Sequence, residues 1–328
     1  MNNSIFNTTG HKYQKIACNN CWGCQLQKSA EWATRIILEC EETKNSTPIW
    51  DEKKKKILHP SNYFITFTYD DEHLHKPEEL VDETTGKVYK NDGTWQGGIL
   101  VENDMKEMFN SMRKYFERKG HVGIKYYYCG EYGENTHRSH FHAIIMNLPL
   151  DITEFYDTHI DKNFKAHWKS HEVEKWWNKG MIDIAEVEWS CAAYVARYTM
   201  KKLGKTKDTE YYYSQGKTPE FVRMSNRPGI GRRYYERNKD KIYERDEIIQ
   251  RTVKGNVGSI KPPKAWDKKF KEEFPKEWEK IKKSRENAIK RSNRITREIT
   301  DYTDYETLKI KAERISQKQK MLPRPGEW

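Results

Sequence analysis

The chain has 328 residues and a net charge of +11, with 35% hydrophobic and 33% charged residues, which fits one large domain or one domain with an appendage. No stretch approaches the roughly eighteen consecutive apolar residues of a membrane span, and the first ten residues lack the basic and apolar regions of a secretory signal. These features exclude a membrane protein and predict a soluble, cytosolic one.

Three cysteines near the N-terminus, Cys18, Cys21 and Cys24, are each separated by two residues. This spacing suits a zinc knuckle better than a disulfide framework in a reducing cytosol. A tetrahedral site needs a fourth ligand, and Cys40 lies about 24 Å away if a helix joins it to Cys24. A structural zinc completed by His11 or a distant residue, and three cysteines without metal, both remain open.

The remaining pattern predicts an α+β protein. Residues 41–60 are expected to form a loop, and residues 76–102 a loop or a loose hairpin. Amphipathic periodicity predicts helices over 26–40, 103–119, 163–178 and 191–203. Strands are expected to begin near Tyr63, Ile124, Phe141 and Ile182. Together they predict a mainly antiparallel central sheet with helices on one face.

Two histidines open the most informative of these strands. The apolar run 141–146 predicts a strand, and because alternate side chains share a face, His140 and His142 point the same way. A turn signal connects it to the preceding strand, 124–131, so the two lie antiparallel and Glu131 reaches the same face. Two imidazoles and one carboxylate suit a divalent metal with open positions for water or phosphate oxygens.

The helix expected over 191–203 carries a tyrosine pair. Residues four apart are neighbours on a helix, so Tyr194 and Tyr198 share one face, and Lys201 and Lys202 follow one turn later. Tyrosines at this spacing are more often packing residues than reactive groups. Their position after the histidine strand, with lysines next to them, favours a chemical role.

The segment that follows is basic and aromatic. Four arginines flank the turn sequence Pro-Gly-Ile-Gly and suit phosphate binding, although a structural turn is an equal alternative: Arg223, Arg227, Arg232 and Arg233. Tyrosines at 211–213 and 234–235 either stack on bases or flank a core. One or two long charged helices are expected over 264–320, and they either clamp DNA, bind another protein or support the domain.

The positive charge is unevenly distributed. Residues 1–189 carry 24 basic and 29 acidic side chains, whereas 190–260 carry 16 and 8, and 261–320 carry 19 and 11. Clustered lysine and arginine are expected where a protein binds a phosphate backbone, although a solvated basic surface would have the same composition. We expect one domain over 1–250 and a basic, mainly helical extension over 251–328.

Five segments carry a family resemblance: CNNCWGCQLQKSAEWATRI (18–36), FITFTYDDEHLH (64–75), CGEYGENTHRSHFHAII (129–145), AAYVARYTMKK (192–202) and MSNRPGIGRRYYE (224–236). In this order they resemble the HUH endonucleases that initiate rolling-circle replication, in particular those of the gokushovirus group of Microviridae. The resemblance covers roughly 11–240. It implies a ferredoxin-like or RRM-like sheet with the histidine strand at its centre.

The resemblance also implies an activity. Such an enzyme nicks and rejoins single-stranded DNA at a phage origin, with Mg²⁺ or Mn²⁺ on Glu131, His140 and His142. Tyr198 or Tyr194 would attack phosphorus, helped by the positive field of Lys201 or Lys202, to leave a 5′-phosphotyrosine and a free 3′-hydroxyl. Single-tyrosine relatives have a lysine three residues after the tyrosine. Tyr198 keeps this offset, whereas Tyr194 has Arg197 there, which favours Tyr198 for the first cut without deciding the order.

The implied partners are single-stranded DNA, with Arg197 among the DNA-binding arginines, and an origin hairpin; a host replication helicase or polymerase is a further one. The implied location is the cytoplasm of the infected bacterial host. Two alternatives remain open at this point. One is a transposase or relaxase of the same chemistry, and the other is a non-catalytic, RRM-like nucleic-acid-binding protein.

Overall fold

A computed structural model of the chain describes residues 22–133, 136–161, 164–201, 206–251 and 257–303, together with short pieces between 306 and 317. The chain divides into two compact units. One consists mainly of residues 35–232, and the other combines the chain up to residue 34 with residues 233–324. The predicted boundary after residue 250 stays a prediction.

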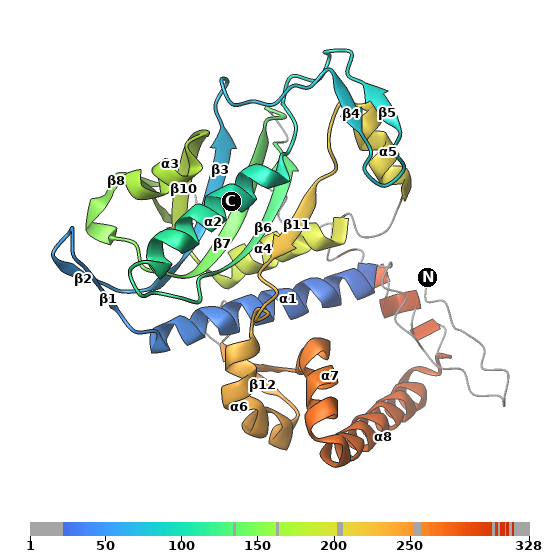
Figure 1. Cartoon of the computed structure of the whole chain (residues 1–328). Coiled ribbons are helices and arrows are strands. Elements are labelled where there is room, and N and C mark those ends of the chain that lie inside the picture. The colour runs from blue at the N-terminus through green and yellow to red at the C-terminus, as the bar shows by residue number, and fades with distance from the viewer. Residues whose placement is uncertain are drawn as a thin grey trace. The chain divides into compact units, whose positions relative to one another are not determined.

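A seven-stranded antiparallel sheet forms the centre of the first unit (Figure 1). From one edge to the other its strands are β11 (Phe221–Met224), β6 (Lys125–Tyr132), β7 (Ser139–Leu148), β3 (Ser61–Tyr69), β10 (Gly180–Glu186), β9 (Ala166–Ser170) and β8 (Phe155–Ile160). The predicted α+β class is confirmed. The histidine strand β7 is an interior strand, flanked by β6 and β3.

One face of this sheet is covered by helices α2 (Glu102–Glu117) and α3 (His171–Trp177), and α2 lies across it in Figure 1. Strand β3 buries every second side chain on this face, as the period of a half-buried strand requires. The methionine stripe of α2 packs there as predicted. The core of this face includes Tyr63, Ile65, Phe67, Phe141, Met105, Met108, Phe109, Met112, Phe116 and Trp177.

The opposite face is also covered, which corrects the expectation that helices lie on one face only. Helix α4 (Trp189–Lys201) contacts β6, β7 and β11 there. The second half of α1 (Trp22–Glu42) reaches the same face, where the buried Glu39 carboxylate lies 2.8 Å from the ammonium group of Lys125 on β6. Two separately amphipathic helices thus leave little of this face apolar and exposed.

The predicted helix over 163–178 is wrong in its first half. Residues 166–170 form strand β9, which pairs with both β8 and β10, and only α3 is helical. Trp168 lies opposite Ile184, so pairing within the sheet overrides a local helical pattern. The expected loops contain two hairpins and short helical turns: β1 (Ile49–Asp51), β2 (Lys56–Leu58), β4 (Glu79–Val81), β5 (Val88–Lys90), η1 (Thr43–Asn45) and η2 (Ile152–Glu154).

Helix α5 (Thr206–Ser214) follows α4 and packs on the β4–β5 hairpin, where Tyr213 stacks on Tyr89 with ring centroids 5.4 Å apart. Tyr213 is buried and Tyr211 is exposed, so the tyrosine run 211–213 is in part a packing element. Among the described helices, none combines the length and the apolar character that a membrane span requires.

The second unit has a small aromatic core of its own. It contains α6 (Arg232–Arg245), β12 (Ile248–Arg251), β13 (Val257–Ile260), α7 (Lys264–Glu273) and α8 (Pro275–Thr300). Tyr243 stacks on Phe270 with centroids 3.8 Å apart, and Tyr235 is fully buried against Trp266. Arg285 joins the parts by hydrogen bonds to Asp246 and Asp267. The charged helices predicted for this region are present up to residue 300.

Candidate metal centre and tyrosine helix

Strand pairing brings the three predicted metal ligands together. Glu131 on β6 lies directly opposite His140 on β7, and His142 is two residues further along the same face. Oε1 of Glu131 lies 3.1 Å from Nε2 of His140 and 2.6 Å from Nε2 of His142. All three ligand atoms lie within 4.8 Å of one another, a spacing that one cation can bridge. The chemistry of the donor set therefore fits a divalent metal.

The second nitrogen of each imidazole is also held. Nδ1 of His142 lies 2.9 Å from the hydroxyl oxygen of Thr66 on β3, and Nδ1 of His140 lies 3.0 Å from the carbonyl oxygen of Arg138. Histidines that bind metals typically use their other ring nitrogen in this way, which directs the coordinating nitrogen. Thr66 was assigned only to a strand face by the sequence. Its signal was its place in the strand before the histidines, but the register that pairs it with His142 could not be deduced.

The electrostatics of this site couple the carboxylate to the imidazoles. Burial raises the pKa of the Glu131 carboxyl, but the adjacent His142 and His140 outweigh burial and hold that pKa well below its usual range. Burial lowers the pKa of His140, whereas the hydrogen bond to Glu131 raises it more strongly. For His142, burial prevails and its pKa is lowered. A buried, ionised carboxylate between two ring nitrogens is an arrangement that a cation stabilises.

Helix α4 places Tyr194 beside these three ligands. Its hydroxyl group donates a hydrogen bond of 2.8 Å to Oε1 of Glu131, and its ring centroid lies 5.4 Å from that of His142. Burial of Ala192, Val195 and Ala196 in the same helix accounts for this orientation. The phenol is only 6% exposed, so a substrate phosphate must approach along the sheet face or displace part of the helix.

The other predicted residues of this helix are only partly described. Tyr198 and Lys201 belong to α4, but their side chains lie outside the described residues, as does all of Lys202. Arg197 is half-buried. The roles expected for Tyr198 and the two lysines therefore stay predictions.

The four arginines beyond the helix do not form one group. Arg223 on β11 faces α2, where its guanidinium group lies 2.5 Å from the carboxylate of Glu102, on the sheet face opposite Glu131. Arg227 is exposed and precedes Pro228, and Arg232 is exposed at the start of α6. Arg233 belongs to the other compact unit.

Of the three clustered cysteines, Cys18 and Cys21 lie outside the described residues. Cys24 lies in the first turns of α1. The zinc prediction stays open for that reason.

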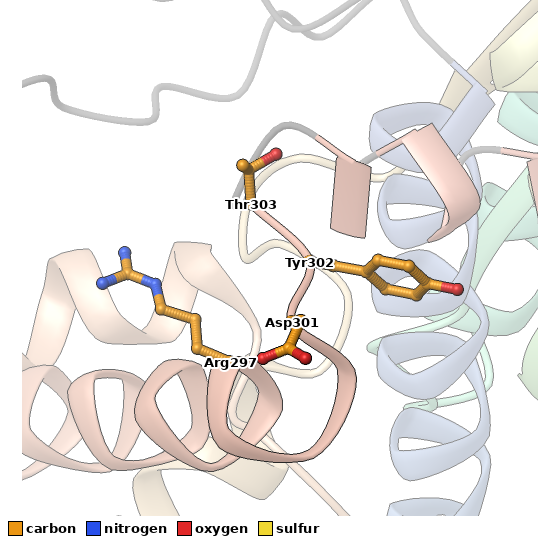
Figure 2. A pocket seen from close by; sticks show the side chains of 4 residues that line it. All are labelled: Arg297, Asp301, Tyr302 and Thr303. Atoms are coloured by element: carbon orange, nitrogen blue, oxygen red, sulfur yellow. The ribbon is translucent and has the colours of Figure 1, made fainter.

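A pocket at the end of α8 has a different composition. It is lined by Arg297, Asp301, Tyr302 and Thr303, and Figure 2 shows the Arg297 guanidinium and the Tyr302 ring pointing to different sides. Asp301 adopts a left-handed conformation, with a φ of 51°, and its N–H group closes the helix on the carbonyl of Arg297. The pocket contains none of the residues predicted to do chemistry.

Comparison with known proteins gives one consistent group of relatives. Residues 62–203 match the family model of the replication-associated protein ORF2, a segment that runs from β3 to the end of α4. The chain is 36% identical over 315 residues to the replication-associated protein ORF2 of Spiroplasma virus 4, which covers 94% of this chain and 85% of the relative.

Two further relatives are more distant. The replication-associated protein VP4 of Bdellovibrio phage phiMH2K is 26% identical over 262 residues, covering 80% of this chain and 69% of the relative. The replication-associated protein ORF4 of Chlamydia phage 1 is 22% identical over 208 residues, covering 61% and 43%. No solved structure matches the chain.

Proposed function

Because the chain belongs to the family of phage replication-associated proteins of the ORF2 type, in its gokushovirus (Microviridae-type) branch, we propose that it nicks and rejoins single-stranded DNA at a phage origin. This activity would start rolling-circle replication in the cytoplasm of the infected bacterial host. Its substrate is the single-stranded origin DNA with its hairpin. The protein is then a metal-dependent tyrosine endonuclease with strand-transfer activity.

One observation carries the proposal: a buried tyrosine hydroxyl lies 2.8 Å from a carboxylate oxygen that two imidazoles also contact. A packing tyrosine needs only some hydrogen-bond acceptor for its hydroxyl. Here the acceptor is the one carboxylate that fits a cation together with His140 and His142. A nucleophile for phosphorus and a binding site for a cation are thus adjacent.

In the proposed reaction, the phenolic oxygen of Tyr194 or Tyr198 attacks the scissile phosphorus, and the bond between phosphorus and the 3′-oxygen breaks. The phenol loses its proton to solvent, and the departing 3′-oxygen takes one up. A bound Mg²⁺ or Mn²⁺ ion supplies Lewis-acid polarisation of the phosphate. Glu131, His140 and His142 hold this ion, and Lys201 or Lys202 stabilises the phenolate by its positive charge. The 5′-phosphotyrosine keeps the bond energy, so the free 3′-hydroxyl can later reverse the reaction.

The two tyrosines have complementary roles in this scheme. One keeps the old 5′ end in covalent linkage while the other cuts the newly made origin. The hydrogen bond between Tyr194 and Glu131 favours Tyr194 for the first cut. This weighs against the preference for Tyr198 that the lysine offset suggested.

The test uses purified protein, Mn²⁺ and single-stranded origin oligonucleotides. We expect a denaturant-resistant protein–DNA band with the wild type and with Tyr211→Phe, a control that alters an exposed tyrosine of α5. The band should disappear in the double variant Tyr194→Phe/Tyr198→Phe and on chelation of the metal. Unchanged adduct in the double variant, or DNA binding with no adduct in any form, would instead support a different nucleophile or a non-catalytic binding protein.

A further inference from the structure

A second group of potential metal ligands lies on three strands that the proposed nicking reaction does not use. His159 on β8, His167 on β9 and Asp183 on β10 bring one ligand atom each to within 4.8 Å of one another. None of the three was singled out by the sequence, because they come from separate segments with no common spacing. Their proximity is a product of the sheet.

A β-bulge aligns the two histidines. Tyr156 lies opposite Lys169, but His159 lies opposite His167, so β8 has one extra residue between these pairs. Asp157 lies within this bulge and has a φ of 52°, in the left-handed region. Without the extra residue, the side chain of His159 would point to the other face of the sheet. The bulge thus directs His159 towards His167.

The third residue shares this face. His167 pairs with Ala185 on β10, and Asp183 is two residues from Ala185, so Asp183 and the two imidazoles lie on the same side. Oδ2 of Asp183 lies 2.6 Å from Nδ1 of His167, and Oδ1 of Asp183 lies 3.7 Å from Nε2 of His159. The carboxylate therefore offers one oxygen to each imidazole.

The remaining nitrogens have the surroundings that metal-binding histidines usually have. Nδ1 of His159 lies 3.5 Å from the carbonyl oxygen of Asp157, and Nε2 of His167 lies 3.7 Å from a carboxylate oxygen of Asp161. A backbone carbonyl or a carboxylate at the non-coordinating nitrogen sets the tautomer and leaves the other nitrogen as a donor. His140 contacts the carbonyl two residues before it in the same manner.

We propose that His159, His167 and Asp183 form a second divalent-cation site, separate from the one at Glu131. Two imidazoles and one carboxylate suit first-row transition ions such as Zn²⁺ or Co²⁺, whereas Mg²⁺ prefers oxygen ligands. The side chains of His159 and Asp183 are 54% and 36% exposed, so the ion has open positions towards solvent. Binding of a cation here does not depend on the nicking activity.

The two sites lie on one face of the same sheet. Asp183 is opposite Thr66, and Thr66 is opposite His142, so a single row of paired residues leads from one site to the other. A cation at the second site would tie the edge strand β8 to β9 and β10. Any ligand that binds only the folded state raises its stability, so the ion should also stabilise this edge.

The alternative is an ordinary ion pair between protonated His167 and Asp183, with His159 stacked on His167 at a centroid distance of 5.1 Å. The two arrangements differ in what His159 contributes. An ion pair does not require it, whereas a three-ligand site loses one ligand when it is replaced. His159 is exposed on an edge strand, so the substitution His159→Gln should leave the fold intact.

The experiment measures Co²⁺ binding to the full chain by calorimetry and by visible absorption. We expect His159→Gln and Asp183→Asn each to bind one equivalent fewer than the wild type, with loss of the corresponding absorption band. His142→Gln should lose a different equivalent, and His142→Gln/His159→Gln should lose two. His171→Gln is the matched control, since His171 is exposed near the same edge but contacts Glu174 and Tyr156.

If His159→Gln binds as many equivalents as the wild type, with the same spectrum, the proposal is overturned and the three residues form only an ion pair. The His142→Gln result is read separately. Loss of an equivalent in His142→Gln but not in His159→Gln would support the first site and refute the second.

Discussion

A hydroxyl group on a neighbouring strand holds one of the two imidazoles in place. For Nε2 of His142 to offer a lone pair to a cation, Nδ1 must carry the proton and donate it to an acceptor, and the Thr66 oxygen lies 2.9 Å away. The ring also stacks on Phe64, with centroids 5.5 Å apart. These contacts restrict the imidazole before any metal binds.

Replacing Thr66 by valine keeps the shape of the side chain and removes the acceptor. We expect the affinity for Mn²⁺ to fall about 10–100-fold, the usual cost of removing such an outer contact. Calorimetric titration measures this change. Thr68→Val is the matched control, since Thr68 is two residues away on the same face of β3. Equal losses of affinity in both variants would mean that the hydroxyl of Thr66 has no specific role.

Asp151 provides a residue-scale test of stability against pH. Burial raises its pKa, but Lys56, Thr153 and Lys54 lower it to about 2, below its ordinary value of 3.8. A carboxyl whose pKa is lower in the folded state stabilises the fold above about pH 4, and this contribution is lost as the pH falls towards 2.

Asp151→Asn should therefore lower the free energy of unfolding by about 1–2 kcal/mol at pH 7. The difference from the wild type should shrink as the pH falls through 4 towards 2. Urea unfolding at pH 7 and pH 3 measures it. A difference of the same size at both values would show that the amide disturbs packing and that charge plays no part.

At this scale, the sequence predicted which residues share a face but not which ones touch. The period of a strand was enough to align His140, His142 and Glu131, because these residues are close in the chain. Thr66 and Asp183 reach the same face through pairing between distant strands, and local periodicity contains no information about that register. The contact of Tyr194 with Glu131 depends in the same way on how α4 packs.

Among the elements, the strands with strong apolar alternation were predicted correctly, and the errors have a common cause. Strands β8 and β9 and the short hairpins bury few side chains, so their sequences lack a clear period. Segment 166–170 was taken for helix because tryptophans recur near it, although hydrogen bonds to β10 hold it extended. Elements that depend on partners for their conformation are those that a single sequence describes least well.

Strand β10 begins at a glycine that a side chain would disrupt. Gly180 has a φ of 140°, and a Cβ atom there would lie 2.3 Å from the carbonyl oxygen of Thr68 and 2.4 Å from the amide nitrogen of Asp70. Both contacts are with backbone, which cannot move without breaking the pairing of β10 with β3.

We expect Gly180→Ala to lower the free energy of unfolding by at least about 2 kcal/mol, as overpacking and backbone strain combine. Urea unfolding measures it. Gly86→Ala is the control for strain alone, since Gly86 also has a positive φ but nothing lies within 4 Å of its missing Cβ atom. Equal effects in the two variants would refute the role of close backbone approach.

On the scale of the whole molecule, charge is separated along the chain. The excess of lysine and arginine begins at the tyrosine helix and continues through α8, whose surface is largely basic. The energy with which such a surface binds DNA comes mainly from the release of cations that surround the DNA, so it depends strongly on salt. Charge of this kind could be predicted from sequence, whereas the division into compact units at residues 34 and 232 could not, because it depends on contacts between distant segments.

Neutralising exposed basic residues of α8 should weaken binding to single-stranded DNA of any sequence. For each phosphate that the variant no longer neutralises, the slope of the logarithm of affinity against the logarithm of salt concentration should become smaller by about 0.7. The test variant replaces four such residues by glutamine: Lys283, Lys290, Arg291 and Arg294. Its control replaces four exposed lysines of the acidic part: Lys53, Lys55, Lys76 and Lys90.

Fluorescence anisotropy at several salt concentrations gives both slopes. If the control variant changes the slope as much as the α8 variant, net charge alone explains the binding and α8 has no particular part in it.

The central claim is that a tyrosine on α4, beside the Glu131, His140 and His142 group, becomes linked to DNA. Its most direct test is mass spectrometry of the protein after reaction with an origin oligonucleotide and Mn²⁺, followed by nuclease and protease digestion. We predict a nucleotide attached through a 5′-phosphate to the peptide that contains Tyr194 and Tyr198. A nucleotide found only on another residue, or none under conditions where the DNA is cut, would contradict the account.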